Sequence, residues 1–120
     1  MIPGIRDVSD KIKVISIVDR YLEHARVFHF HHGGEDKVFV SSADWMTRNL
    51  SYRVETVFPI YTKKLKQQVL DILELQWSDN VKARIIDKRQ ANKYKKNSAA
   101  MPIRSQLETY FYFKRLQRKQ

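Results

Sequence analysis

The sequence contains no cysteine, so it forms neither disulfides nor thiolate metal sites. A chain without disulfides is typical of a reducing compartment, which favours the cytoplasm, with peripheral association at the inner face of the membrane as a further option. No apolar run approaches the roughly 20 residues that a membrane-spanning helix needs, and the N-terminal residues lack the apolar core of a signal peptide.

Acidic residues are also few. There are 13 of them against 23 Lys and Arg, which gives a formal net charge of +10 and a pI near 9.9. Such a surplus favours a polyanionic partner: nucleic acid, an anionic membrane or a phosphate polymer. A solvated basic surface would give the same total, so local chemistry must decide. With 120 residues, 42% of them hydrophobic, the chain is expected to form a single domain, residues 1–120, with a real core.

The N-terminal half contains a hairpin pattern. Residues 26–32 and 37–41 suit strands, and the two glycines and two acidic residues at 33–36 suit the turn between them. Upstream, the apolar residues of 14–22 recur at helical spacing, which predicts a short helix ending near Glu23, although 11–17 also alternates like a strand.

The rest of the chain alternates between strand and helix patterns. We expect a third strand over 53–60, a helix around 65–75 that Thr62 caps, a strand over 81–86, an exposed basic loop over 88–96, and a C-terminal helix with Pro102 in its first turn. The sum is an α/β (α+β) fold with a small central β-sheet flanked by helices.

One cluster of residue types suits phosphoryl chemistry. If the first hairpin strand begins near His24, period two places His24 and Arg26 on the same face. The imidazole can exchange a proton near neutral pH, and the guanidinium can fork two phosphate oxygens. Ser42 ends the partner strand within plausible reach, and Asp44 could orient the imidazole. Taken alone, a histidine in such a place is more often structural.

Other conspicuous residues have plainer interpretations. The three histidines at 29, 31 and 32 suit solvent-facing hairpin positions better than a metal site, and no metal ligand is assigned. Trp45 and Trp77 are expected to be buried anchors rather than stacking platforms. The basic segment between Lys88 and Lys96 could be a solvated face or a guide for a polyanion, and the sequence leaves both open.

The stretches 15–28 (ISIVDRYLEHARVF) and 37–49 (KVFVSSADWMTRN) resemble the C-terminal catalytic domain of bacterial polyphosphate kinases. The resemblance continues through 52–55, 65–72, 78–79 and 81–84, and fades in the basic segment and the last helix. It implies a phospholipase-D-like half-domain. The wider phospholipase D pattern has His-x-Lys followed by Asp, whereas here Arg26 replaces the Lys and His31 stands at the Asp position, so no Asp role is carried over.

The resemblance implies a function as well. The chain would be the C-terminal part of an ATP:polyphosphate phosphotransferase that reversibly moves the terminal phosphate of ATP to inorganic polyphosphate through a phosphohistidine in an upstream domain. His24 would contact the nucleotide phosphates and assist transfer, and Arg53 would bind phosphate. ATP and magnesium would be bound mainly by the upstream domains, and the full-length enzyme could be a homo-oligomer.

This fragment alone is expected to be inactive, because half of the cleft would be missing. The competing function is a basic nucleic-acid-binding module, although no recognisable nucleic-acid motif is present and no nucleic-acid partner is expected. A third interpretation is a dimerisation or regulatory domain without chemistry.

Overall fold

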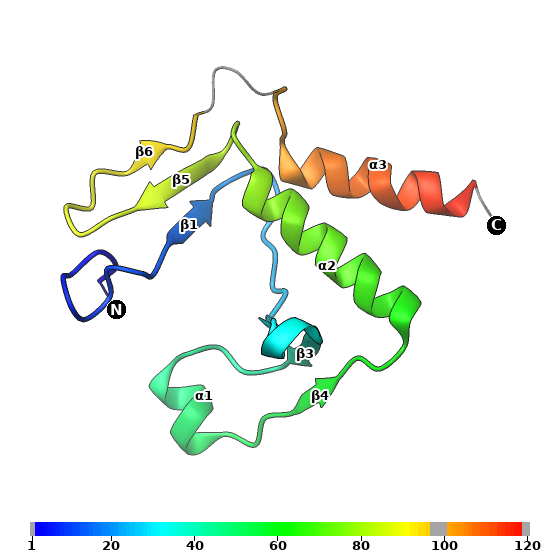
Figure 1. Ribbon diagram of the computed structural model, residues 1–120, viewed down its shortest axis with the longest axis horizontal. Coiled ribbons are helices and arrows are strands. Elements are labelled where there is room, and N and C mark those ends of the chain that lie inside the picture. The colour runs from blue at the N-terminus through cyan, green and yellow to red at the C-terminus, as the bar shows by residue number, and fades with distance from the viewer. Residues whose placement is uncertain (1, 97–100, 119–120) are drawn as a thin grey trace. The chain divides into compact units, whose positions relative to one another are not determined.

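The computed structural model describes residues 2–96 and 101–118 (Figure 1). Its elements, in chain order, are β1 (Val14–Ile17), β2 (Val27–Phe30), the 3-10 helix η1 (His32–Gly34), β3 (Lys37–Ser41), α1 (Thr47–Tyr52), β4 (Val57–Pro59), α2 (Lys63–Ser78), β5 (Ala83–Ile86), β6 (Lys93–Tyr94) and α3 (Ser105–Gln117). The α+β class predicted from the sequence is confirmed. No helix among these residues has the length and apolar character to cross a bilayer.

The strands form two antiparallel sheets rather than the single central sheet expected. One sheet has the order β1-β5-β6 and the other β2-β3-β4. The chain correspondingly divides into two compact units. We call them the terminal unit (Met1–Leu22 and Leu73–Gln120) and the hairpin unit (Glu23–Ile72). Whether they act as the one domain expected from chain length stays a prediction.

The hairpin unit follows the sequence closely. Val27 pairs with Val40 and Phe30 with Lys37 across β2 and β3, and Gly33 and Gly34 adopt the positive φ angles that the connection requires. β4 then pairs with β3, with Ser41 opposite Val57. Val38, in the middle of β3, is only 1% exposed and forms the centre of this unit.

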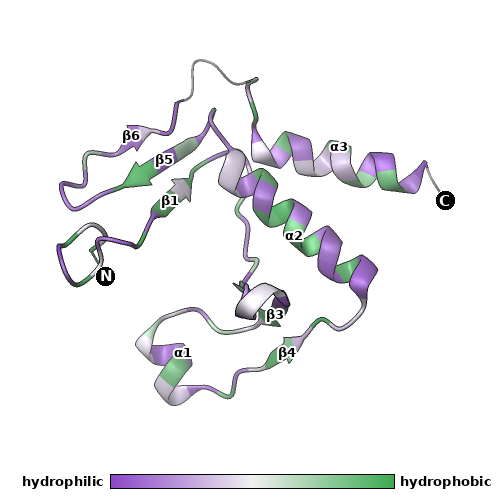
Figure 2. Ribbon diagram, viewed as in Figure 1, coloured by the Kyte–Doolittle hydropathy of each residue, from purple (hydrophilic) through white to green (hydrophobic). Residues whose placement is uncertain are grey.

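The terminal unit is built around β5. Val14 pairs with Ile86 and Ile17 with Ala83 across β1 and β5, and Lys93 pairs with Ile85 on the other side. Ala83 is fully buried. Figure 2 shows hydrophobic residues in β5, and hydrophobic positions recurring between hydrophilic ones along α2, as expected for an amphipathic helix.

Four local predictions were wrong. Residues 14–17 form β1, not a helix, because the β-branched run pairs with β5 far along the chain. The connection after Asp44 contains helix α1, so the third strand begins only at Val57. The loop over 88–96 contains β6. Pro102 precedes α3 instead of lying in its first turn.

Candidate functional site

The end of the β2-β3-β4 sheet gathers polar side chains. At this end of the strands, the Ser41 N–H donates to the Arg26 carbonyl at 2.8 Å, and the Ser42 N–H donates to the Thr56 carbonyl at 3.0 Å. The three strands therefore meet at one edge, where the residues that precede β2, follow β3 and precede β4 come together. Within the hairpin unit this edge is where the predicted site residues lie.

Arg26 and Asp44 form a two-point ion pair at this edge. The Arg26 guanidinium donates from Nε to Oδ1 at 2.6 Å and from Nη2 to Oδ2 at 3.1 Å, with side chains 25% and 40% exposed. The hydrogen bond from Arg26 is the main cause that lowers the pKa of Asp44; partial burial opposes it, and the charges of Arg26, His24 and Arg48 add to it. The sequence suggested that Asp44 could orient the imidazole of His24. In the structure its carboxylate is instead hydrogen-bonded to Arg26.

His24 is exposed beside this pair. Its backbone carbonyl lies 3.5 Å from Nη1 of Arg26, and its side chain is close enough to Asp44 to contribute to lowering the pKa of that carboxyl. A pocket of about 230 Å³ opens next to it, and Arg26, Asp44 and Trp45 are among the lining residues. The imidazole is thus accessible, as a group that meets a substrate must be.

Glu55 organises the other half of the edge. Its carboxylate accepts hydrogen bonds from the Ser42 hydroxyl and, at 2.7 Å, from Nδ2 of Asn49. The Ser42 hydroxyl accepts in turn from the Thr56 N–H at 3.0 Å. The bond from Ser42 and then that from Asn49 lower the pKa of Glu55, against a smaller effect of burial, and the charges of Arg53 and Arg26 lower it further.

Arg53 is held loosely by comparison. Its Nε lies 3.8 Å from Oε1 of Glu55, and its side chain is 57% exposed. Arg53 is therefore partly exposed and paired with a carboxylate. Arg26 is the residue common to both halves of the edge. Its charge lowers the pKa of Asp44, which His24 also lowers, and that of Glu55, which pairs with Arg53.

Sequence reasoning assigned no role to Glu55 or Asn49. Asn49 is 4% exposed, and its Oδ1 is buried without a hydrogen-bond partner among the described residues, while its Nδ2 holds Glu55. A signal for Glu55 was available, because a carboxylate two positions after a candidate phosphate-binding arginine is well placed to pair with it. Nothing local in the sequence indicates that Asn49 is buried.

The aromatic and histidine predictions had mixed outcomes. The expectation that both tryptophans are buried was wrong: Trp45 is 81% exposed and Trp77 45% exposed. In the hairpin turn, Oδ1 of Asp36 lies 2.7 Å from Nε2 of His29 and 3.5 Å from Nδ1 of His31. Among the described residues, no three His, Cys, Asp or Glu side chains are grouped as a metal site would require.

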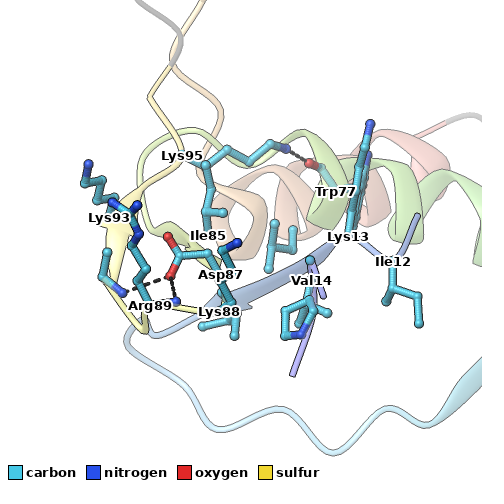
Figure 3. A pocket seen from close by; sticks show the side chains of 15 residues that line it. Ile12, Lys13, Val14, Trp77, Ile85, Asp87, Lys88, Arg89, Lys93 and Lys95 are labelled. Atoms are coloured by element: carbon cyan, nitrogen blue, oxygen red, sulfur yellow. Dashed lines mark hydrogen bonds between the residues drawn. The ribbon is translucent and has the colours of Figure 1, made fainter. Parts of the chain in front are cut away.

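The terminal unit contains a larger pocket, of about 630 Å³ (Figure 3). It lies at the start of β1 and the end of β5, and Trp77 near the end of α2 contributes to its wall. The basic segment between Lys88 and Lys96 supplies much of its rim, so this segment is not merely a solvated loop.

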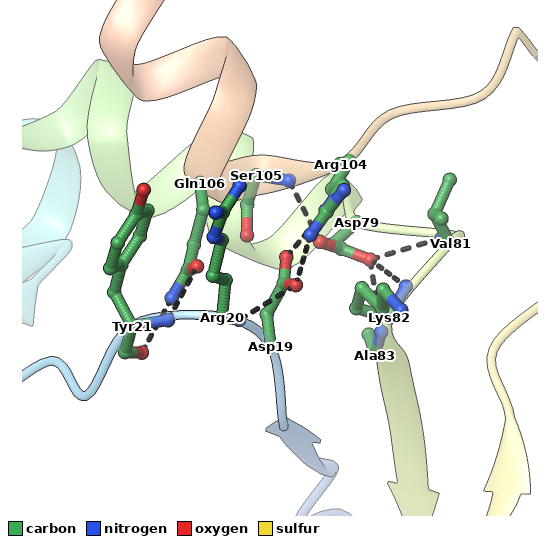
Figure 4. A network of polar contacts seen from close by, with 10 residues as sticks. All are labelled: Asp19, Arg20, Tyr21, Asp79, Val81, Lys82, Ala83, Arg104, Ser105 and Gln106. Atoms are coloured by element: carbon green, nitrogen blue, oxygen red, sulfur yellow. Dashed lines mark hydrogen bonds and ion pairs between the residues drawn. The ribbon is translucent and has the colours of Figure 1, made fainter.

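A polar network stabilises the terminal unit (Figure 4). Asp79 is fully buried, and its carboxylate accepts backbone N–H bonds from Val81, Lys82, Ala83 and Ser105 at 2.7–3.0 Å. Asp19 accepts two bonds from the Arg104 guanidinium, at 2.6 and 2.8 Å. These carboxylates tie the start of α3 to β1 and β5, and they have no access to a ligand.

Comparison with known proteins identifies the relatives of this chain. Residues 1–106 match the family described as polyphosphate kinase C-terminal domain 2. Polyphosphate kinase of Escherichia coli strain K12 is 51% identical over 98% of the chain, and that of Halalkalibacterium halodurans is 53% identical over 91%. The crystal structure of polyphosphate kinase from Porphyromonas gingivalis superimposes with a TM-score of 0.94 over 99% of the chain, at 44% identity, and the match covers 18% of that protein. The chain spans 17% of the Escherichia coli K12 relative and 16% of the Halalkalibacterium one.

Proposed function

Since the chain belongs to the polyphosphate kinase C-terminal domain family, we propose that it forms one wall of the active site of an ATP:polyphosphate phosphotransferase. ATP and inorganic polyphosphate are the substrates, and other parts of the full-length enzyme supply the phosphorylated histidine. The observation that carries the proposal is an exposed histidine beside the Arg26–Asp44 pair, at the sheet edge where Glu55 also pairs with Arg53.

His24 is the residue that we assign to the transferring phosphate. Phosphoryl transfer depends mainly on positioning and on stabilising charge at the phosphate oxygens. A protonated imidazole donates a hydrogen bond to such an oxygen, and a neutral one accepts a proton from it. The accessible imidazole of His24 can do either without disturbing the fold, since the described residues make no hydrogen bond to its ring.

Arg53 is the residue that we assign to phosphate binding. An arginine binds phosphate through two parallel N–H bonds, and it must release its resident partner to do so. The contact to Glu55 is long, at 3.8 Å, and the side chain is mostly exposed, so this release is easy. Glu55 keeps the guanidinium near the edge because Ser42 and Asn49 fix its carboxylate.

Arg26 contributes its charge to the same phosphates, but its guanidinium here donates both of its parallel hydrogen bonds to Asp44. Ser42 and Asp44 are positioning residues: Ser42 orients Glu55, and Asp44 orients Arg26. Guanidinium groups held in place by carboxylates are suited to stabilise the charge that develops on a transferred phosphoryl group.

Magnesium ligands are not apparent among the residues that the structure describes. Mg²⁺ prefers carboxylate oxygens, usually one or two together with phosphates and water. The two carboxylates at the site already accept from Arg26 and from Ser42 and Asn49. No step of the proposal therefore runs through a metal held by these residues. The cytoplasmic location is likewise part of the proposal, as is the inactivity of the isolated chain.

Replacement of His24 tests the proposal directly. In the complete polypeptide that carries these residues, we expect His24→Ala to reduce synthesis of polyphosphate from ATP by about 100-fold or more, the usual contribution of one acid–base group. The circular dichroism spectrum should be unchanged, because the side chain is exposed.

His32→Asn provides the matched control. His32 is an exposed histidine of the same unit, and its φ of 42° is one that asparagine tolerates. This variant should retain activity within about twofold of wild type. A folded His24→Ala variant with activity equal to that of His32→Asn would make His24 merely structural and end the proposal.

A further inference from the structure

The large pocket of the terminal unit combines an apolar floor with a basic rim. Ile15 and Ile85, which are opposite each other on β1 and β5, lie in the floor, and Trp77 forms part of the wall. Among its described lining residues are five cationic side chains, from Lys13, Lys88, Arg89, Lys93 and Lys95, and one carboxylate, from Asp87. In the view of Figure 3, Lys93 and Arg89 lie to one side of Ile85 and Val14, and Lys13 to the other.

The one carboxylate does little to neutralise the rim. Asp87 offsets only one of the five positive charges. Its Oδ1 accepts the backbone N–H groups of Arg89 and Ala91, each at 3.0 Å, so it also closes the turn between β5 and β6. Cations gathered on one concave surface repel one another and concentrate anions from solution. The pocket therefore favours a ligand that carries several negative charges.

The strand register explains why cations and apolar side chains alternate here. Ile15 is opposite Ile85, and Ile85 is opposite Lys93, so the three lie in one row across the sheet. Side chains opposite each other in an antiparallel sheet share a face. Period two then places Lys13 and Lys95 on this face as well. Lys95 bonds the Trp77 carbonyl, and its ammonium lies 5.3 Å from the centre of the indole ring.

An apolar floor distinguishes between possible anions. A purely inorganic phosphate chain has no group that gains from contact with isoleucine and indole, and it would leave Ile85 and Trp77, which are 44% and 45% exposed, beside strongly hydrated oxygens. A ligand with a flat, weakly polar ring and several phosphates fits both the apolar floor and the basic rim. The volume of about 630 Å³ lies within the roughly 300–1,000 Å³ range of small-molecule sites.

We propose that this pocket binds a nucleoside polyphosphate, with the base between Ile85 of the floor and Trp77 of the wall, and the phosphates on the rim of Lys13, Lys93 and Arg89. The site belongs to the terminal unit and uses none of the residues of the His24 edge, so it is a second nucleotide site and does not depend on the function proposed for that edge. The fraction of sites occupied would follow the nucleotide concentration, so this site is suited to regulate the enzyme by that concentration.

Photolabelling of the complete polypeptide tests the proposal. 8-Azido-ATP carries its reactive group on the base, so the labelled peptides report where the base lies. We expect label on the peptides that contain Trp77 and Ile85, abolished by excess ATP but not by the same concentration of tripolyphosphate. Lys13→Ala/Lys93→Ala should reduce this label about tenfold or more, because two charge-assisted phosphate contacts are lost.

Two further variants make the result interpretable. Lys13→Arg/Lys93→Arg retains both charges and should retain the label, which separates loss of binding from loss of fold. His24→Ala should leave the label at Trp77 and Ile85 unchanged, which separates this site from the one proposed at the His24 edge. Absence of label from these peptides would overturn the proposal. So would equal protection by tripolyphosphate, or full labelling of a folded Lys13→Ala/Lys93→Ala variant.

Discussion

Arg26 and Asp44 are joined by two hydrogen bonds, of 2.6 and 3.1 Å, across the open end of the β2–β3 hairpin. Two-point pairing between a guanidinium and a carboxylate fixes both side chains in one orientation, which a single contact does not. The pair therefore sets the shape of the edge beside His24. It also uses the carboxylate that a histidine would otherwise engage.

The first prediction concerns this pair. In a double-mutant cycle of Arg26→Ala and Asp44→Ala, we expect a clear coupling in thermal stability at pH 7, because the geometry is bidentate and partly buried. The pair Arg6–Asp7 is the control: its 3.5 Å contact joins side chains that are 94% and 87% exposed, and it should show almost no coupling. Equal coupling in the two pairs would contradict the importance of the two-point geometry.

The same pair gives a dependence on pH. The pKa of Asp44 is lower in the folded protein than its ordinary value of about 3.9, mainly because of the hydrogen bond from Arg26. A lowered pKa contributes stability that is fully present above the ordinary value and is lost as the pH falls through the folded value. The coupling should therefore be constant from neutral pH to about pH 5 and disappear in stronger acid.

The second prediction concerns Glu55. A carboxylate accepts from both Ser42 and Asn49, whereas the amide of Glu55→Gln would turn its NH₂ group toward one of these donors. For Glu55→Gln we expect a lower melting temperature and a higher KM for ATP in the complete enzyme. Arg53 loses the charged group that it pairs with, and the hydrogen bonds from Ser42 and Asn49 are disturbed. Glu35→Gln, an exposed carboxylate in the hairpin turn, should change neither quantity.

A third prediction follows from the proposed substrate. Binding of long-chain polyphosphate to the complete polypeptide should weaken as salt rises, because each phosphate paired with Lys or Arg releases counterions. For a single-stranded polyanion the slope of log K against log salt is about −0.7 per contact. Titration at several salt concentrations measures it. A flat line would argue against a cationic site, and equal affinity for duplex DNA would favour the nucleic-acid-binding alternative.

The sequence was informative where the interactions are local. The hairpin could be predicted because strand-forming residues flank Gly33 and Gly34, and the hairpin alone brings Arg26 toward Ser42 and Asp44. The apolar spacing in 14–22 predicts a helix, although 11–17 also alternates like a strand. Only pairing with Ala83–Ile86 selects the strand, and such a distant partner leaves no local signal.

The two pockets differ in the same way. The pocket beside His24 is formed by residues on either side of the hairpin, which the predicted turn brings together. The basic pocket joins Lys13 to Lys93 through two strand pairings. Its charges were visible in the composition, but their convergence depends on tertiary contacts, and the exposure of Trp77 was contrary to expectation.

The last prediction concerns Asp79, the buried anchor of the terminal unit. Its Oδ1 accepts the N–H groups of Val81, Lys82 and Ala83, and its Oδ2 accepts that of Ser105 at 2.8 Å, so one side chain joins the start of β5 to the start of α3. Burial acts to raise its pKa, but the backbone hydrogen bonds outweigh burial and hold the pKa below its ordinary value.

Asp79→Ala would leave the Ala83 and Ser105 N–H groups buried without acceptors, each at a cost of about 1–3 kcal/mol. We therefore expect the local free energy of opening, measured by hydrogen exchange of these two amides, to fall by about 2–5 kcal/mol at pH 7. Asp79→Asn retains one acceptor and should lose less. Asp10→Asn, at an exposed position of the same unit, should stay within about 0.5 kcal/mol of wild type.

Because the pKa of Asp79 is lowered, the advantage of wild type over Asp79→Asn is present above about pH 4 and should shrink as the pH falls further. A difference that stayed constant into strong acid would show that the carboxylate acts through its shape and not through its charge.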